Sequence, residues 1–215
     1  MTSATTTSVD YSRLSMPVGE AMFTQRSIRR LKPDPIPMDD LRLIVEAAVK
    51  APNGGNSQPA RFLLVTDKDL IREFGAIYKE AWWAKRRDQG WKTFEDLPKD
   101  GSSYRNAAQL AEDIKDAPAV VFAFGVGAGG GALSVVPGTQ NLMLAARTLG
   151  IGSCPTTLHP EVMERFNKLF NVPDNAQFHF CIPLGYPQGN FGPTSRKPTA
   201  EVTYLDKWDQ PVPWA

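Results

Sequence analysis

Apolar residues along the chain alternate between the spacing of a helix and the continuous runs of a buried strand. Side chains three and four positions apart are typical of a helical face, and runs of about four to eight apolar residues are typical of a buried strand. The helical spacing predicts four helices, over residues 37–51, 67–85, 138–149 and 160–170. The apolar runs predict strands over residues 61–66, 117–124 and 177–184. This alternation, with no repeat and no dividing linker, indicates one α/β or α+β domain.

Three stretches lack a regular pattern. Residues 1–20 begin with a Ser/Thr-rich run, and we expect a flexible N-terminal arm there, followed by a single domain over residues 21–215. Residues 82–103 mix tryptophans, charges and glycine, which predicts a partly helical excursion of the kind that often covers a site. Residues 185–198 are rich in glycine and proline and are predicted to form a loop.

Charge and composition narrow the function classes. The 215 residues include 24 Lys and Arg against 23 Asp and Glu, a net charge of +1, so the broad basic surface of a nucleic-acid-binding protein is not expected. No apolar run approaches the ~18 residues of a membrane span, and the first residues lack the apolar core of a secretion signal, so we expect a cytoplasmic protein. Cys154 and Cys181 lie in apolar surroundings, which predicts two buried free thiols, with a disulfide as the alternative.

Two polar segments between these elements carry the candidate chemistry. Residues 25–30 place three arginines beside a serine hydroxyl, which suits a phosphate because guanidinium forks bind phosphate oxygens in pairs. Residues 51–59 place Asn53, Asn56 and Gln58 among glycines and prolines, which suits a flat heterocycle because carboxamides both donate and accept hydrogen bonds. Taken separately, a solvated basic turn and a polar loop are the simpler interpretations. Taken together, the two segments predict the two ends of one site for a phosphorylated aromatic cofactor.

Other motifs are weaker. Gly127–Ala132 fits the G-x-G-x-x-A spacing of a dinucleotide-binding turn, but no acidic residue follows about 20 positions later to bind a ribose. The next helix is expected to begin after Pro137. His159 and His179 have no carboxylate or thiol at ligand spacing, so no metal site is expected. The lack of a G-x-S-x-G motif argues against a serine hydrolase.

The two polar segments resemble those of the FMN-dependent nitroreductase family. That family begins with an Arg-Ser-x-Arg segment, which matches residues 26–29, and continues through a helix into an Ala-Pro-Ser-x-x-Asn-x-Gln-Pro-Trp loop, which is similar to residues 51–60. Later parts of the family have counterparts at residues 116–121, 140–153, 184–187 and 196–198. The resemblance covers roughly residues 23–203.

The resemblance implies a fold and a cofactor. It implies an α+β nitroreductase-like fold, with a central, mostly antiparallel sheet flanked by helices, in an intertwined homodimer that binds FMN between its subunits. The residues that would bind FMN, some of them from the partner subunit, are Arg26, Ser27, Arg29, Pro52, Asn53, Asn56, Gln58, Pro155, Thr156, Thr157, Leu158 and Arg196. Arg29 would also stabilise the negative charge of the reduced flavin. No side chain would act as an acid, a nucleophile or a metal ligand.

The resemblance also implies an activity. Hydride would pass from NADPH or NADH through the flavin to a nitroaromatic, a quinone or a similar electron-poor small molecule, by a ping-pong mechanism. Reductive dehalogenation, flavin destruction for cobalamin ligand synthesis and hydride supply from a deazaflavin stay open within the same fold. Two alternatives of other classes are a non-catalytic flavin-binding protein and an NAD-dependent Rossmann dehydrogenase that uses the Gly127–Ala132 turn.

Overall fold

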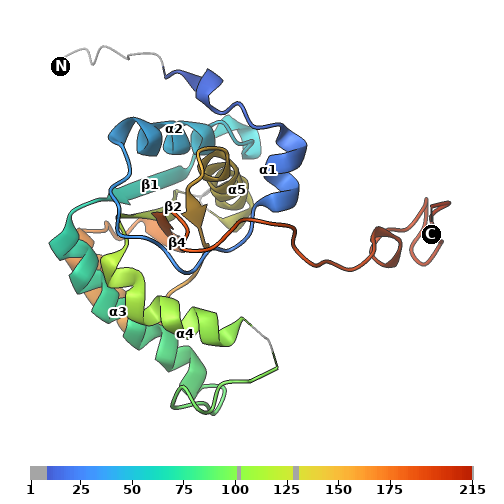
Figure 1. Cartoon of the computed structure of the whole chain (residues 1–215). Coiled ribbons are helices and arrows are strands. Elements are labelled where there is room, and N and C mark those ends of the chain that lie inside the picture. Colours follow the sequence, from blue (N-terminus) through green and yellow to red (C-terminus); the bar gives the residue numbers. More distant parts are fainter. Residues whose placement is uncertain (1–8, 101–102, 128–130, 215) are drawn as a thin grey trace.

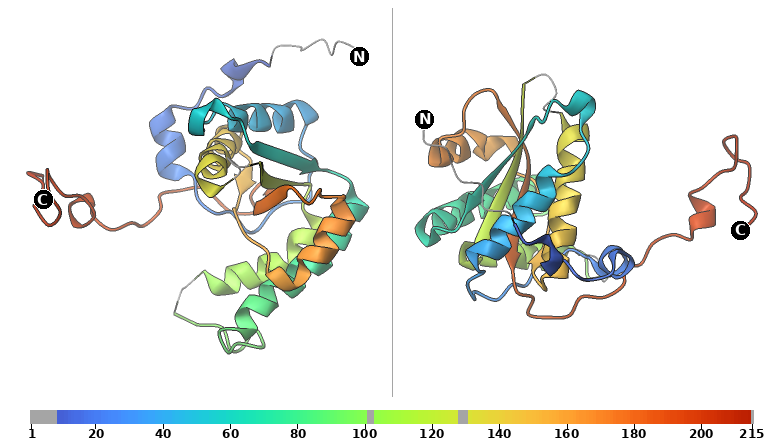
Figure 2. Two further views of the ribbon diagram at one scale, coloured as in Figure 1. Left: turned by 180° about the vertical axis from the view of Figure 1, so that it is seen from behind. Right: turned by 90° about the horizontal axis from the view of Figure 1, so that it is seen from above.

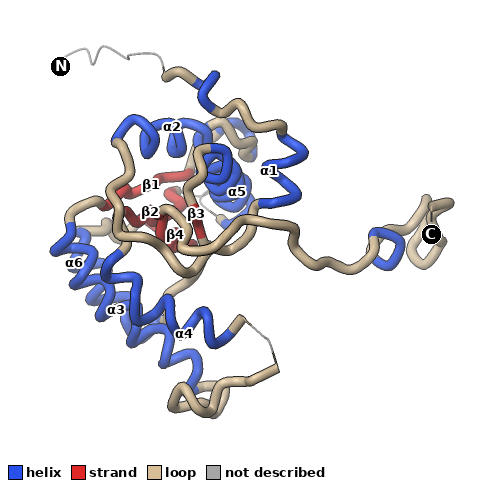
Figure 3. Tube along the Cα trace, in the orientation of Figure 1, coloured by secondary structure: helices blue, strands red, loops and turns tan. Residues whose placement is uncertain are grey.

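The computed structural model describes residues 9–100, 103–127 and 131–214 (Figure 1). Its α-helices are α1 (Val18–Thr24), α2 (Met38–Val49), α3 (Lys68–Arg87), α4 (Tyr104–Asp113), α5 (Ala132–Thr148) and α6 (Met163–Phe170). Its strands are β1 (Ala60–Val65), β2 (Ala119–Val126), β3 (Gly152–Ser153) and β4 (Ala176–Gly185). Short 3₁₀ turns lie at Tyr11–Arg13, Gly54–Asn56, Ile114–Asp116, Pro160–Val162 and Thr199–Glu201. Figure 3 shows that loops connect most of these elements and that a long loop follows β4.

The strands form one small sheet in the order β1-β2-β4-β3, and each neighbouring pair is antiparallel. The three strands predicted from apolar runs are therefore confirmed. The hydrophobic pattern did not predict β3, because two residues are too few to show an alternation. The Rossmann alternative is wrong, because that fold requires parallel strands.

Both faces of the sheet are covered by helices, which explains why β2 is apolar at consecutive positions. Val120 and Phe122 face one core with residues of α3, α4 and α6. Val121 and Ala123 face the other core, with residues of α2 and α5. Figures 1 and 2 show these two helical layers on opposite sides of the strands.

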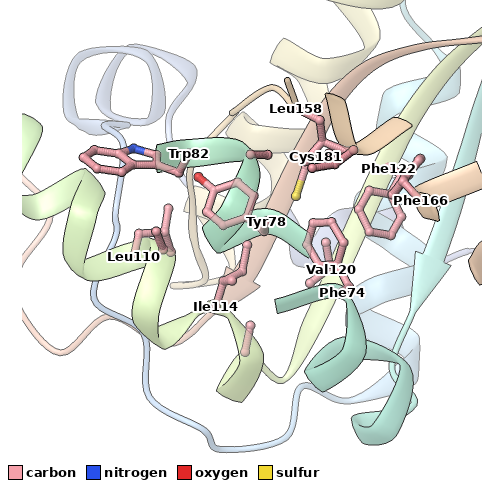
Figure 4. Close-up of a cluster of buried hydrophobic side chains, with 14 of the residues drawn as sticks. Phe74, Tyr78, Trp82, Leu110, Ile114, Val120, Phe122, Leu158, Phe166 and Cys181 are labelled. Atoms are coloured by element: carbon pink, nitrogen blue, oxygen red, sulfur yellow. The ribbon is translucent and has the colours of Figure 1, made fainter. Parts of the chain in front are cut away.

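Aromatic rings fill the core on the α3 side (Figure 4). The ring of Phe122 lies 4.8 Å from that of Phe74 and 5.0 Å from that of Phe166, both in edge-on geometry. Phe74 and Phe166 are fully buried. Edge-on ring pairs of this kind add to the hydrophobic gain of burial, so α3, β2 and α6 are held together at one point.

The structure places the start of α5 earlier than expected. The expectation that this helix begins after Pro137 is wrong, because α5 begins at Ala132 and contains the proline. Proline removes only the hydrogen bond to the carbonyl four residues earlier, that of Leu133. The Leu133 side chain is 93% exposed, so water can reach this first turn. Residues 128–130 of the proposed dinucleotide turn lie outside the described residues.

The excursion at residues 82–103 is partly helical, as expected, since α3 continues to Arg87. Sequence periodicity missed α4, which follows it and packs on α3. Trp91 and Tyr104 pack edge-on with ring centroids 4.9 Å apart, so these aromatics make packing contacts. No helix among the described residues is both long and apolar enough to cross a membrane.

Candidate functional site

The basic segment, residues 25–30, lies at the β3 edge of the sheet. Ser27 forms a parallel bridge with Ser153 of β3, and the Ile28 amide donates to the Ser153 carbonyl at 2.9 Å. Further along, the Lys32 amide donates to the Tyr186 carbonyl at 2.7 Å. The segment is thus held to the sheet as an irregular extra strand, which fixes the backbone from which Ser27 and Arg29 project.

The charge of Arg29, and polar contacts from Ser27 and Arg29, favour the thiolate of Cys154 and lower its pKa. Burial nevertheless raises the pKa of Cys154 above its ordinary value, because the effects of the two partners are smaller than the cost of desolvation. Complete burial likewise raises the pKa of Cys181. Both cysteines are free and buried, which confirms the prediction, and a protonated buried thiol is a poor nucleophile.

The turn over residues 155–158 lies beside this cluster and is held from two sides. Its Thr156 exchanges backbone hydrogen bonds with Cys181 of β4, at 2.9 and 2.8 Å. From α3, the Tyr78 hydroxyl lies 3.0 Å from Thr156 Oγ1. Lys85 Nζ donates to the Thr157 carbonyl at 2.7 Å and to its Oγ1 at 2.5 Å. The turn is therefore fixed in place before any ligand binds.

Sequence reasoning missed Tyr78 and Lys85. Burial raises the pKa of Tyr78 far above its ordinary value and lowers the pKa of Lys85, with Arg86 adding to the effect on the lysine. Burial disfavours the charged form of either group. A signal was present in the sequence, because the two residues are seven positions apart on a predicted helix and so share a face.

The carboxamide loop, residues 51–59, lies at the other edge of the sheet, directly before β1. Asn53 Oδ1 accepts a hydrogen bond from the Gln58 amide at 2.8 Å, and Asn56 and Gln58 have positive φ angles of 52° and 49°. Asn53 and Gln58 line a small cavity together with Ser134 of α5. Pro52 belongs to the same loop and comes directly before Asn53. The loop is thus folded on itself, with its cavity at the start of α5.

The two polar segments do not meet within one chain. Ser134 near the start of α5 lies at the carboxamide loop, whereas Arg147 near its end donates to Thr24 Oγ1 at 2.9 Å, beside the basic segment. Thirteen residues of helix span about 20 Å. The structure therefore brings together Ser27, Arg29 and the turn over residues 155–158, and it places the carboxamide loop at a distance from them.

Arg196 belongs to the C-terminal segment that follows β4. It is exposed and its guanidinium donates to the Ser195 carbonyl at 2.8 Å. Figures 1 and 2 show that the C-terminal segment runs outward from the body of the molecule. Contact between Arg196 and the basic segment would require a second copy of the chain or a different course of this segment.

The chemistry of the basic segment fits an anionic ligand. Arg26 and Arg29 form no ion pair with a carboxylate of the described residues. Both can therefore bind a phosphate group or another anion with charge-assisted hydrogen bonds. Leu158 of the turn is buried in the core on the α3 side, so its side chain anchors the turn to the body of the protein.

The fold and this site can be compared with known proteins. The profile of the Nitroreductase family matches residues 23–186. The chain belongs to the nitroreductase family. It is 30% identical in sequence to the NADH dehydrogenase of Thermus thermophilus, over 85% of this chain and 92% of the relative. It is also 28% identical to the iodotyrosine deiodinase of Thermotoga neapolitana, over 83% of this chain and 91% of the relative.

The fold of this nitroreductase-family protein also matches solved structures. It is similar to oxidized iodotyrosine deiodinase bound to FMN and 3-iodo-L-tyrosine, with a TM-score of 0.69 and 24% identity, over 89% of this chain and 99% of that one. At this level of sequence identity, the structural similarity shows that the two proteins share a fold and shows nothing about function. The nitroreductase-like fold, helices with a small antiparallel sheet, is therefore shown for this chain.

Proposed function

We propose that this nitroreductase-family protein is an FMN-dependent oxidoreductase that uses NADPH or NADH to reduce a small electron-poor acceptor, such as a nitroaromatic or a quinone. The observation that carries the proposal is a basic segment beside a preformed turn, in a chain of this family; its Arg26 and Arg29 form no ion pair with a carboxylate of the described residues. FMN, when bound, would accept two electrons from the nicotinamide and pass them to the acceptor.

The chain's own residues would place the cofactor and tune its charge. Arg26, Ser27 and, by family resemblance, Arg196 would bind the phosphate and ribityl end. Arg29 would lie near the pyrimidine edge of the ring and stabilise negative charge there. The turn over residues 155–158 would present its backbone and its hydroxyl groups to the ring, held by α3 and β4. The cysteine thiols stay protonated and supply no nucleophile.

A homodimer would complete the site, and this part of the proposal follows from the separation of the two polar segments. Exposed apolar side chains flank both of them. Leu133 at the carboxamide loop is 93% exposed, and Phe23 beside the basic segment is 78% exposed. Burial of these side chains in a symmetric interface would set the carboxamide loop of one copy against the basic segment of the other, as the family resemblance implies.

Reductive dehalogenation of an aromatic substrate is a second candidate. It is supported by the 28% identity to the Thermotoga neapolitana iodotyrosine deiodinase over most of both chains. The two functions share the cofactor site and differ only in the acceptor. They are separated by testing a nitroaromatic, a quinone and 3-iodo-L-tyrosine as acceptors for the same reduced protein.

An absorbance spectrum of the purified protein tests the proposal. Flavin bands that bleach on anaerobic addition of NADPH or NADH, and return with an acceptor, support it. Parallel initial-rate lines are expected when one site serves donor and acceptor in turn. Intersecting lines would count against this scheme, and a coloured protein that neither nicotinamide reduces would indicate a non-catalytic flavin-binding protein.

Arg29→Ala tests the placement of the site. Loss of a charge-assisted hydrogen bond should weaken FMN binding about tenfold or more, and the reduction by nicotinamide should slow. Arg72→Ala is the matched control, because Arg72 pairs with the exposed Asp69 on α3. Equal FMN affinities of the two variants would place the cofactor elsewhere.

A further inference from the structure

Two ionisable side chains on one face of α3 hold adjacent threonines of the turn over residues 155–158. Tyr78 contacts Thr156 through the two hydroxyl groups, at 3.0 Å. Lys85, two helical turns later, donates to the Thr157 carbonyl at 2.7 Å and to the Thr157 hydroxyl at 2.5 Å. The proposed function uses these contacts only to hold the turn in place, and it assigns no role to the charge of Lys85.

The contact between Lys85 and Thr157 sets the direction of the threonine proton. A lysine ammonium has three donors and no acceptor, whereas a hydroxyl has one donor and two acceptor positions. Thr157 Oγ1 must therefore accept from Lys85, and its own O–H must point to a different acceptor. Thr157 is exposed, so this O–H can donate to a ligand outside the turn, where the proposed function puts the flavin.

We propose that Lys85 is a positioning residue, which fixes the Thr157 hydroxyl as a hydrogen-bond donor to the bound flavin and withdraws this donor when Lys85 loses its proton. The inference rests on the proposed function. A neutral amine can accept a hydrogen bond, and the Thr157 O–H would then turn back toward Lys85. The flavin would lose one donor, although no atom of the backbone had moved.

The surroundings of Lys85 favour this exchange at a lower pH than for a fully exposed lysine. Burial lowers the pKa of Lys85, the charge of Arg86 lowers it further, and Cys181 opposes the change. Among the described residues no carboxylate forms an ion pair with Lys85. The other ionisable groups around the turn are Tyr78 on α3, Arg29 on the basic segment, Cys154 after β3, and the surface network of Asp88, His159, Glu161 and Arg87.

Tyr78 should not imitate the effect of Lys85. Burial raises the pKa of Tyr78 and lowers that of Lys85, so the tyrosine keeps its proton while the lysine titrates. The Tyr78–Thr156 pair is thus a natural control. Tyr78 lies on the same helix as Lys85 and contacts the same turn, but its charge does not change over the pH range in which Lys85 titrates.

The dissociation constant of FMN, measured by fluorescence from neutral to alkaline pH, tests the proposal. In the wild type it should rise about fivefold as Lys85 loses its proton, which is the effect of one hydrogen bond of ordinary net strength. Lys85→Arg keeps the cation and should not show this rise. Thr157→Val should bind FMN more weakly at neutral pH and should also lack the rise, whereas Thr156→Val should retain it. Titration of the flavin itself is common to all variants, so the rise that tests the proposal is the excess over Lys85→Arg.

An equal alkaline rise in the wild type and in Thr157→Val would overturn the proposal. The apoprotein gives a second measurement that does not depend on FMN. The NMR shift of the Thr157 methyl group should follow the titration of Lys85 in the wild type and stay constant in Lys85→Arg. A constant shift in the wild type would also overturn the inference, whereas a protein that binds no FMN at any pH would contradict only the proposed function.

Discussion

Replacing Gly152 with alanine should damage both the fold and the candidate site, because the added methyl group has no space. A Cβ atom at this position would lie 2.8 Å from both Cβ and Cγ2 of Ile28, and 3.2 Å from the Gly185 carbonyl oxygen. Rotation of the Ile28 side chain cannot relieve a clash with its own Cβ. The backbone of the basic segment must therefore move away from β3.

The size of the effect follows from two terms. Overpacking of a filled interior costs about 1–3 kcal/mol, and the hydrogen bond from the Ile28 amide to the Ser153 carbonyl, 2.9 Å long, contributes about 1 kcal/mol that a shift would weaken. We expect the free energy of unfolding to fall by about 2 kcal/mol. Since Ser27 and Arg29 flank Ile28, we also expect FMN to bind at least about tenfold more weakly.

Urea unfolding and FMN fluorescence titration measure the two effects. Gly189→Ala is the matched control, because no heavy atom lies within 4 Å of a Cβ built there. That variant should keep the wild-type stability or exceed it slightly, since alanine restricts the unfolded chain. A Gly152→Ala protein with the wild-type urea midpoint and the wild-type FMN affinity would refute the claim that Ile28 holds the basic segment against the sheet.

Three further changes test the fold. Phe166→Ala should lower the free energy of unfolding by about 3–5 kcal/mol, because the ring is fully buried among other aromatics, and Phe166→Leu should cost less in the same urea titration. Asp67→Ala should cost about 1 kcal/mol, because Asp67 Oδ1 caps α3 with bonds of 2.9 and 3.0 Å; Asp69→Ala, which removes the same charge but no cap, should cost less. Gly75→Ala should lower the thermal midpoint although alanine favours helices by about 1 kcal/mol, since its Cβ would lie 2.6 Å from that of Lys115; a raised midpoint would contradict this.

Sequence periodicity was sufficient to predict the elements that bury one face or both faces in the core. The strand over residues 117–124 and the helix over residues 67–85 are close to the observed β2 and α3. Periodicity failed where contacts with distant parts of the chain determine the local structure. Periodicity predicted no strand at Gly152, whereas the structure shows a strand residue that lies against Ile28 with no room for a side chain.

Sequence motifs identified the polar groups of the candidate site but not their arrangement. The Arg-Ser-x-Arg segment and the turn over residues 155–158 are adjacent because both pair with the β3–β4 edge, and no local signal encodes that contact. Tyr78 and Lys85 were missed because their partners are 78 and 72 residues away in the chain. Spacing along a helix shows which residues share a face, but it does not show what that face contacts.

The position of α5 has a consequence for how cofactor binding and assembly depend on each other. The carboxamide loop and the basic segment lie near its opposite ends, about 20 Å apart, and exposed apolar residues flank each of them. If two copies supply one site, FMN binds the dimer in preference to the monomer. Flavin then stabilises the dimer by mass action, and the dimer raises the affinity for flavin. Dilution should therefore release FMN, and Leu133→Lys, which places a charge in the proposed interface, should lower dimerisation and flavin content together. A flavin-saturated monomer in sedimentation experiments would show that one chain completes the site alone.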